Sequence, residues 1–200
     1  MNEQDPQLNQ PAEDADNNAA PAEGDGTVGR PSAKIPPHEE NAPPEILNPR
    51  GKATIALLNR VADPYVIKSG GRDDIPWIEI KAQNLVEVTR RCRDSKDLDL
   101  KMLHCLLVVD YIDYFQVLYI LLSPNNGNRA MVKVNITPAD PTVPTVTSLW
   151  GSANWYEREM HDLFGVKFEG HPDLKPLILF EGFEGYPGRK SFPFHEYEEF

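Results

Sequence analysis

The sequence predicts an α+β fold in which helices pack on a small, mostly antiparallel sheet. Apolar residues recur at helical spacing in three segments, and three consecutive stretches within residues 103–136 have the composition and length of strands. The two ends of the chain differ from this pattern, because the first is acidic and rich in proline and the last has no clear period. We therefore expect a disordered tail at 1–47, an α+β domain at 48–165 and an extended C-terminal arm at 166–200.

The domain begins with a predicted helix and a predicted pair of strands. Residues 54–62 carry apolar side chains at the spacing of one helix face. Residues 65–68 and 77–81 have the composition of strands and lie on either side of a Ser-Gly-Gly sequence at 69–71. We expect this sequence to form the turn between them.

A second helix is predicted to start at Asn84. Asn84 is a favourable N-cap residue, and Glu87 three residues later completes the pattern of a capping box. The buried face of this helix should consist of Leu85, Val88 and Cys92, which recur at helical spacing.

Three strands should follow in series, at 103–109, 115–122 and 130–136. The middle strand is apolar on both faces apart from Gln116, so both of its faces should be covered. The third strand alternates apolar and polar residues, which is typical of a strand with one wetter face. A turn is expected at 124–128, which contains proline, glycine and asparagine.

The last predicted helix runs from residue 148 to residue 164, after a proline-broken segment at 138–144. Gly165 should end it as the C-cap glycine. On such a helix one apolar stripe is formed by Leu149, Ala153, Tyr156, Met160 and Leu163.

Charge and composition exclude several classes of protein. The formal net charge is −11, and residues 1–48 hold ten acidic residues against only Arg30 and Lys34. Such an acidic chain has no footprint for nucleic acid, and its N-terminus resembles neither a secretory signal nor a mitochondrial presequence. We expect a cytoplasmic setting.

Membrane insertion and cysteine-bound cofactors are also disfavoured. Residues 103–122 have about the length of a membrane span, but Asp110 and Asp113 lie within it, and each would cost about 2.5–3.5 kcal/mol at a bilayer centre. The chain has only two cysteines, Cys92 and Cys105, whereas an iron–sulfur cluster normally takes four. Neither a cluster nor a structural zinc site is predicted on this chain.

The densest group of ionisable residues lies at 155–174, and one hypothesis makes it a metal or catalytic site. Glu157 and His161 are four residues apart on the predicted helix, so they could form a ligand pair. His171 or Asp173 would then have to arrive from the arm, because a metal site needs three or four convergent ligands. A stand-alone metal-dependent enzyme using Glu157, His161 and His171 stays an alternative.

The structural interpretation of the same residues is favoured. Glu157 with His161, and Arg158 with Asp162, would be ion pairs or hydrogen-bonded pairs that fix the helix. Glu159 would bond to backbone groups or to another subunit. Charges beside aromatic residues then indicate a protein–protein contact, in which the rings provide buried apolar area and the charges fix how the two partners are aligned.

The group of residues at 155–174, called the motif below, is similar to the signature of the C subunit of NADH-quinone oxidoreductase, the 30 kDa subunit family of respiratory complex I. The resemblance is dense over about twenty residues and weaker from about residue 108 onward. The residues that carry it, and that we expect at subunit interfaces, are Glu157, Arg158, Glu159, Asp162, Phe164, Gly165, Phe168, Gly170, His171, Pro172, Asp173, Leu174, Arg189 and Lys190. Leu163 also lies inside the motif.

The resemblance implies a non-catalytic structural subunit without a metal, flavin or iron–sulfur cluster of its own. It implies a hetero-oligomer with D, B and I type subunits in the peripheral arm of a proton-translocating complex, where FMN, iron–sulfur clusters and quinone are bound by other chains. Electrons would pass from NADH to quinone in this respiratory-chain translocase. The chain would be peripheral to a bacterial inner membrane, on the cytoplasmic side, with membrane contact only through the complex.

The sequence also departs from the family. Lys175 and Pro176 stand where the family usually has two arginines, so a bidentate contact from those positions is lost. Homologous subunits also occur in energy-converting membrane hydrogenases and ferredoxin-driven relatives. A subunit of such a complex is therefore the other alternative.

Overall fold

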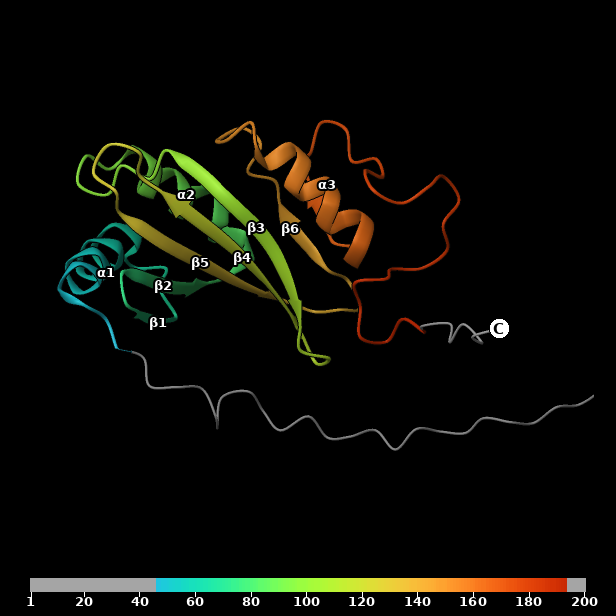
Figure 1. The fold of residues 1–200 in the computed structure, drawn as a ribbon, viewed down its shortest axis with the longest axis horizontal. Coiled ribbons are helices and arrows are strands. Elements are labelled where there is room, and N and C mark those ends of the chain that lie inside the picture. Colours follow the sequence, from blue (N-terminus) through green and yellow to red (C-terminus); the bar gives the residue numbers. More distant parts are fainter. Residues whose placement is uncertain (1–45, 194–200) are drawn as a thin grey trace, which may run out of the picture. The chain divides into compact units, whose positions relative to one another are not determined.

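The computed structural model describes residues 46–193, so the predicted tail lies outside the described residues except for positions 46 and 47. Residues 170–193, called the C-terminal segment below, contain no helix or strand (Figure 1). The elements before them are α1 (Pro49–Ala62), β1 (Lys68–Arg72), β2 (Ile75–Ile80), the 3-10 helix η1 (Ala82–Asn84), α2 (Leu85–Asp94), β3 (Met102–Asp110), β4 (Phe115–Leu122), β5 (Arg129–Ile136), β6 (Thr142–Pro144), α3 (Ala153–Phe164) and β7 (Lys167–Glu169).

Five strands form one sheet in the order β1-β2-β5-β4-β3. β2 and β5 are parallel, and the other three neighbouring pairs are antiparallel. The parallel pair is possible because α2 and the β3–β4 hairpin carry the chain across between them. A separate parallel pair joins β6 to β7, with Val143 opposite Phe168. The predicted α+β fold with a mostly antiparallel sheet is confirmed.

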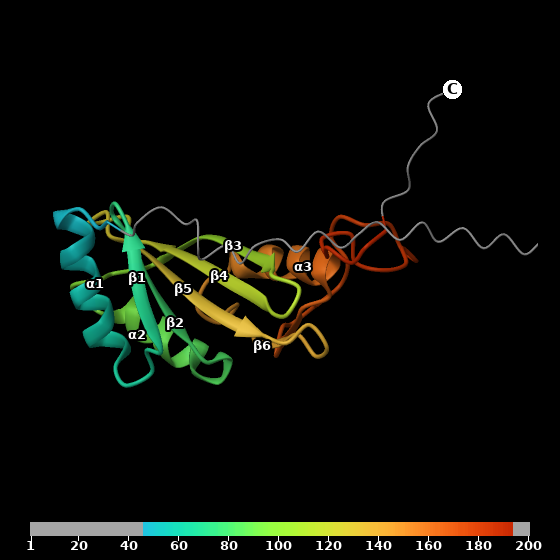
Figure 2. The same ribbon diagram turned by 90° about the horizontal axis from the view of Figure 1, so that it is seen from below.

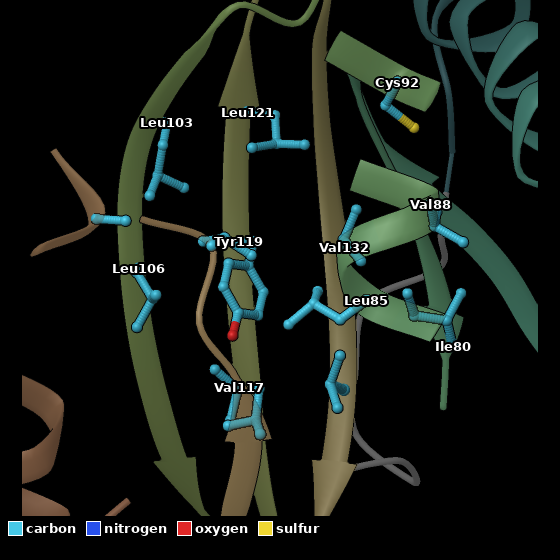
Figure 3. Packing of buried hydrophobic residues seen from close by; sticks show 14 of the residues in the cluster. Ile80, Leu85, Val88, Cys92, Leu103, Leu106, Val117, Tyr119, Leu121 and Val132 are labelled. Carbon is cyan, nitrogen blue, oxygen red and sulfur yellow. The ribbon is translucent and has the colours of Figure 1, made fainter. Parts of the chain in front are cut away.

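One face of the sheet packs against α2. Leu85, Val88 and Cys92 are fully buried, as predicted, and Leu85 extends toward Tyr119 of β4 and Val132 of β5 (Figure 3). Full burial of a large aliphatic side chain stabilises a fold by roughly 1.5–3 kcal/mol. This layer therefore holds the sheet and its helices together.

The other face of β3, β4 and β5 has no helix over it within residues 46–193. Both views place α2 on one side of these strands only (Figures 1 and 2). Leu107, Leu118 and Ile120 lie half-buried on the second face. The sequence predicts cover on both faces of β4, and the described part of the chain provides it on one.

α1 begins at Pro49, five residues before the predicted start. The side chain of Asn48 caps it by accepting a hydrogen bond from the backbone N–H of Gly51 at 2.8 Å. Proline at the first helical position fits because its missing N–H would have no partner there. The apolar spacing predicted only the later turns of this helix, because these turns are more amphipathic than the first one.

The predicted turn at 69–71 is wrong, because these residues lie inside β1. The chain turns instead at Asp73 and Asp74, between β1 and β2. A Cβ on Gly71 would lie 2.7 Å from a methyl carbon of Leu47, so glycine here permits a close approach of two chain segments.

The capping box predicted for α2 is also wrong, although the helix starts where expected. Asn84 is the last residue of η1 and has helical φ and ψ, so its side chain does not cap α2. Glu87 accepts a hydrogen bond from Arg91 at 2.8 Å instead. A preceding 3-10 turn changes the geometry that the capping box requires.

α3 begins at Ala153, five residues later than predicted, because residues 146–152 form turns. Leu149 therefore lies outside the helix, and Leu163 is only half-buried. The buried residues of α3 are Ala153, Glu157, Met160 and Asp162. The helix thus directs two carboxylates into the protein, which the apolar stripe did not predict.

Gly165 ends α3 as predicted, with a left-handed φ of 72°. A Cβ at this position would lie 2.6 Å from the ring of Tyr186.

We expect Gly165→Ala to lower the free energy of unfolding by about 1–3 kcal/mol, since it combines backbone strain with this overlap. Urea unfolding measures the change. Gly151→Ala is the matched control, because nothing lies within 4 Å of its added Cβ, and equal effects of the two substitutions would contradict this account.

Candidate functional site

α3 and the C-terminal segment bring most of the motif into one region, at the end of the domain where the chain leaves β7 (Figures 1 and 2). β7 contributes Phe168, which is 3% exposed and pairs with β6. The C-terminal segment then turns at Gly170, where φ is 82°, and later returns to the end of α3. The predicted arm therefore begins with residues that belong to the core, and only residues from 170 onward are free of strand structure.

Glu157 is fully buried between α3 and the segment after β6. It accepts hydrogen bonds from the Thr145 hydroxyl at 2.5 Å and the Val146 backbone N–H at 2.8 Å. Burial raises the pKa of Glu157 from 4.5 to about 7, against the opposite effect of these two hydrogen bonds. Burial, with a smaller effect of the Glu157 charge, likewise raises the pKa of Tyr119 well above its usual value. This carboxylate ties the start of α3 to the core.

Asp162 is 7% exposed and holds the C-terminal segment by its backbone. One of its oxygens, Oδ2, accepts hydrogen bonds from the N–H groups of Leu177, Ile178 and Leu179 at 2.8–3.2 Å. Burial alone would raise the pKa of Asp162, but these three donors and His161 bring it below its usual value. Asp162 therefore stays ionised while nearly buried.

Arg158 binds the same segment one turn earlier. Its guanidinium donates to the carbonyl oxygens of Lys175 at 3.0 Å and Pro176 at 2.9 Å. Backbone carbonyls are present whatever the side chain, so the departure from the usual arginine pair at these positions leaves this contact intact.

Arg189 and Lys190 close the segment against the other end of α3. Arg189 donates to the carbonyl oxygen of Phe164 at 2.7 Å, and its guanidinium lies over the ring of Phe115. The backbone N–H of Lys190 donates to Oδ2 of Asp110 at 2.8 Å. Sequence reasoning missed Asp110 as a site residue, because a carboxylate at a strand end gives no signal of a partner 80 positions away.

The predicted i, i+4 pairs within α3 are wrong as contacts. Glu157 bonds to Thr145 and Val146 rather than to His161, and Arg158 bonds to backbone carbonyls rather than to Asp162. Backbone groups of the segments that pack on α3 compete with the neighbouring side chains for these charges. Partners at fixed positions are favoured where a charge is nearly buried, whereas an ion pair on a solvated helix surface contributes little.

The two histidines also have separate partners. Nδ1 of His161 donates to the carbonyl oxygen of Val166 at 2.9 Å. Nδ1 of His171 accepts from the backbone N–H of Asp173, so its Nε2 is the donor to the carbonyl oxygen of Asn154 at 3.2 Å. Within residues 46–193 no group of three or more His, Cys, Asp or Glu side chains is placed to hold a metal ion. The proposed set of Glu157, His161 and His171 is not brought together.

The remaining motif residues lie nearer the surface. Pro172 and Asp173 are exposed, and Asp173 pairs with the exposed ammonium of Lys175 at 3.1 Å. Leu174 is half-buried against the core. The carboxylate of Glu159 is half-buried and has no hydrogen bond to another described residue. Burial, with a smaller effect of the Glu159 charge, raises the pKa of Cys105.

The fold and motif define an α+β chain whose buried charges fix its own C-terminal segment. Residues 78–198 match the family model described as "Respiratory-chain NADH dehydrogenase, 30 Kd subunit". The chain belongs to this family. No helix within residues 46–193 is long and apolar enough to span a bilayer.

Curated relatives agree with this assignment. The C subunits of NADH-quinone oxidoreductase from Burkholderia mallei (strain SAVP1) and Burkholderia pseudomallei (strain K96243) are 42% identical to this chain over 130 residues. These alignments cover 60% of this chain, which spans 65% of the length of each relative.

Two solved structures share the fold. One is a chain of the membrane-bound sulfane sulfur reductase, an archaeal respiratory membrane complex, with a TM-score of 0.63 and 25% identity over 72% of this chain and 85% of that one. The other is a trypsin-resistant fragment of Nqo5, residues 1–134, with a TM-score of 0.50 and 34% identity. It covers 62% of this chain and 99% of the fragment.

Glu157 should make stability depend on pH. Its pKa is about 7 in the folded chain against 4.5 as the ordinary value, so the folded chain binds more protons between these pH values. Its contribution is present in full below about pH 4.5 and is lost as the pH rises through about 7, with a total of at most about 3 kcal/mol. Unfolding by urea at several pH values from about 5 to 8 measures this loss.

Glu157→Gln should flatten that dependence, because an amide does not titrate. Glu87→Gln, on the exposed face of α2, is the control and should keep it. A wild-type chain and a Glu157→Gln chain with the same pH dependence would contradict the assignment.

Asp162→Ala should release the C-terminal segment. Three backbone N–H groups lose their acceptor, and we expect the free energy of unfolding to fall by about 1–3 kcal/mol. Hydrogen exchange of the amides of Leu177, Ile178 and Leu179 reports the release directly. Asp173→Ala removes an exposed carboxylate and should leave these amides protected; unchanged protection in Asp162→Ala would refute the proposed role.

Proposed function

We propose that this chain is a non-catalytic structural subunit in the peripheral arm of a proton-translocating NADH:quinone oxidoreductase. Membership of the 30 kDa subunit family supports this, as do relatives named as the C subunit of that enzyme. In this proposal, electron transfer from NADH through FMN and iron–sulfur clusters to quinone takes place on other chains. This chain supplies contacts that hold the electron-transfer subunits in position.

The observation that carries the proposal is that charged side chains of the motif bind backbone groups. Arg158, Asp162 and Arg189 all bond to backbone groups and thereby give the C-terminal segment a fixed path along α3. A segment without helix or strand needs such bonds to hold one conformation, because its backbone has no ladder of its own. A fixed segment presents the same surface to a partner each time, which lowers the entropy cost of association.

The surface so presented is apolar. Ile178 is 57% exposed and Phe180 is 71% exposed in the C-terminal segment, and Trp155 on α3 is 66% exposed. Large exposed apolar side chains at fixed positions are typical of protein–protein contacts. We propose that neighbouring subunits of the D, B and I types cover these side chains and the motif residues around them.

The uncovered face of β3–β5 supports the same conclusion. Leu118 and Ile120 on this face would be polar in a sheet that faces water, whereas they are apolar here. We infer that another chain of the complex lies against them. Contact with a bacterial inner membrane, on its cytoplasmic side, would then be indirect and made through the complex.

A subunit of a related complex is the second candidate. The likeness to a chain of the sulfane sulfur reductase favours it, because that protein is a respiratory membrane complex of another kind. The proteins that co-purify with this chain distinguish the candidates. NADH-oxidising, FMN-binding subunits support the first, and hydrogenase-type or ferredoxin-linked subunits in their place support the second.

Replacing the exposed apolar side chains should disrupt assembly without unfolding the chain. We expect Ile178→Ser and Phe180→Ser each to reduce the partner subunits recovered with an affinity-tagged chain by about tenfold, since central apolar contacts dominate interface energies. Mass spectrometry of the purified complex measures recovery, and NADH:quinone activity of membranes should fall with it.

Ile67→Ser is the matched control, since Ile67 is 52% exposed but lies in the loop before β1. It should assemble as the wild type does. Urea unfolding should give the same stability for all three variants. Normal recovery of partners with both Ile178→Ser and Phe180→Ser would refute the interface.

A further inference from the structure

The C-terminal segment and the end of α3 enclose a hollow of about 180 Å³ that the proposed function does not use. Its lining includes two polar side chains, His161 and Asp162. Its walls are mainly aromatic and apolar, with Leu179, Phe180, Phe183 and Tyr186 among them. The chemistry of this lining selects one class of ligand.

These two polar side chains offer hydrogen-bond acceptors. Oδ2 of Asp162 is occupied by three backbone N–H groups, whereas Oδ1 has no hydrogen bond to any described residue. Nδ1 of His161 carries a proton, because it bonds to the carbonyl oxygen of Val166, which only accepts. In the neutral ring Nε2 is therefore an acceptor. Oδ1 of this nearly buried carboxylate is itself open to solvent, so it can accept from a donor on a ligand, and an ionised carboxylate favours a cation most of all.

The aromatic walls favour the same charge. Phe180 and Phe183 meet edge to face with ring centroids 5.3 Å apart, and Phe183 stacks on Phe192. The ring of Tyr186 already carries the guanidinium of Arg189 4.5 Å from its centroid, so a ligand would stack on Phe180 or Phe183 instead. Aromatic faces attract cations, and guanidinium groups most often.

The chain's own nearby guanidinium groups already donate to backbone carbonyl oxygens. Arg158 donates to the carbonyl oxygens of Lys175 and Pro176, and Arg189 donates to that of Phe164. An anion is disfavoured by the carboxylate. An ammonium group is more strongly hydrated than a guanidinium and lacks its planar fork, so it matches a ring face and two acceptors less well.

We propose that this hollow is a binding site for a guanidinium group, carried by an arginine side chain of a neighbouring protein. The guanidinium donates to Oδ1 of Asp162 and Nε2 of His161 and stacks against the rings of the C-terminal segment. Such an arginine, enclosed by aromatic side chains, has the character of an interface hot spot. That its source is another subunit rests on the proposed function; the guanidinium specificity of the hollow does not.

The site is tested on the purified full-length chain with two small probes. N-acetyl-arginine amide carries the guanidinium, and N-acetyl-citrulline amide has the same shape without the charge. We expect the arginine probe to cause saturable NMR shifts of the backbone amides of residues 179–186, with an affinity at least about tenfold above that of citrulline. Equal binding of the two probes would overturn the proposal.

Asp162→Asn separates this role from the anchoring of the segment. An amide oxygen can still accept from the N–H groups of Leu177, Ile178 and Leu179, but the negative charge is lost. We expect arginine binding to fall by about tenfold or more while these three amides stay protected from exchange. Asp173→Asn, an exposed carboxylate outside the hollow, should bind the probe as the wild type does.

Phe180→Leu provides a second variant if Asp162→Asn does not fold. Phe180 is 71% exposed, so its replacement leaves the core unchanged, and loss of its ring should weaken arginine binding several-fold. Unchanged arginine binding in Phe180→Leu and in a folded Asp162→Asn chain would exclude the site.

Assembly distinguishes failure of this inference from failure of the proposed function. If the wild-type chain recovers no complex subunits, the proposed function fails, whatever the probes show. If the wild type assembles and Asp162→Asn recovers partners about tenfold less well, a partner arginine is supported. If Asp162→Asn loses the probe but assembles normally, the partner origin of the arginine is wrong.

Discussion

The hydrogen bonds from three consecutive backbone N–H groups to Asp162 are the constraint on which the C-terminal half of the structure depends. The C-terminal segment has no strand or helix to satisfy its own backbone, so it can lie against α3 only if a side chain replaces the missing ladder. One ionised oxygen of Asp162 binds three of the segment's N–H groups, beside the contacts of Arg158 and Arg189, and charge-assisted hydrogen bonds are stronger than neutral ones. The path of the segment, the exposure of Phe180 and the hollow beside α3 all follow from that attachment.

Two other buried carboxylates act in the same way. Glu157 accepts the N–H of Val146 and so joins α3 to the segment after β6, and Asp110 accepts the N–H groups of Ile112 and Lys190. In each case a carboxylate on a regular element binds the backbone of an irregular one. Two donors to each carboxylate reduce the cost of burying its charge, although burial still raises the pKa of Glu157 to about 7. This use of carboxylates explains how a domain with a long irregular end keeps one conformation.

The apolar surfaces divide the molecule into a part that is covered within residues 46–193 and a part that these residues leave uncovered. The layer between α2 and the sheet is fully buried, as are Val143 and Phe168 where β6 meets β7. The second face of β3–β5 and the side chains of Ile178 and Phe180 are not covered by residues 46–193. The proposed role as a subunit would explain this division, because a subunit of a larger assembly buries part of its apolar surface only in that assembly.

The sequence by itself determined the α+β class, the three central strands, the buried face of α2 and the C-cap at Gly165, because each depends on local periodicity or on the conformational freedom of one residue. It also identified the motif that marks the family. Only the tertiary structure decided the partners of the motif charges, the parallel pairing of β2 with β5 and the role of Asp110. These depend on segments far apart in the sequence, and a backbone N–H that meets a carboxylate 80 residues away leaves no pattern in either segment.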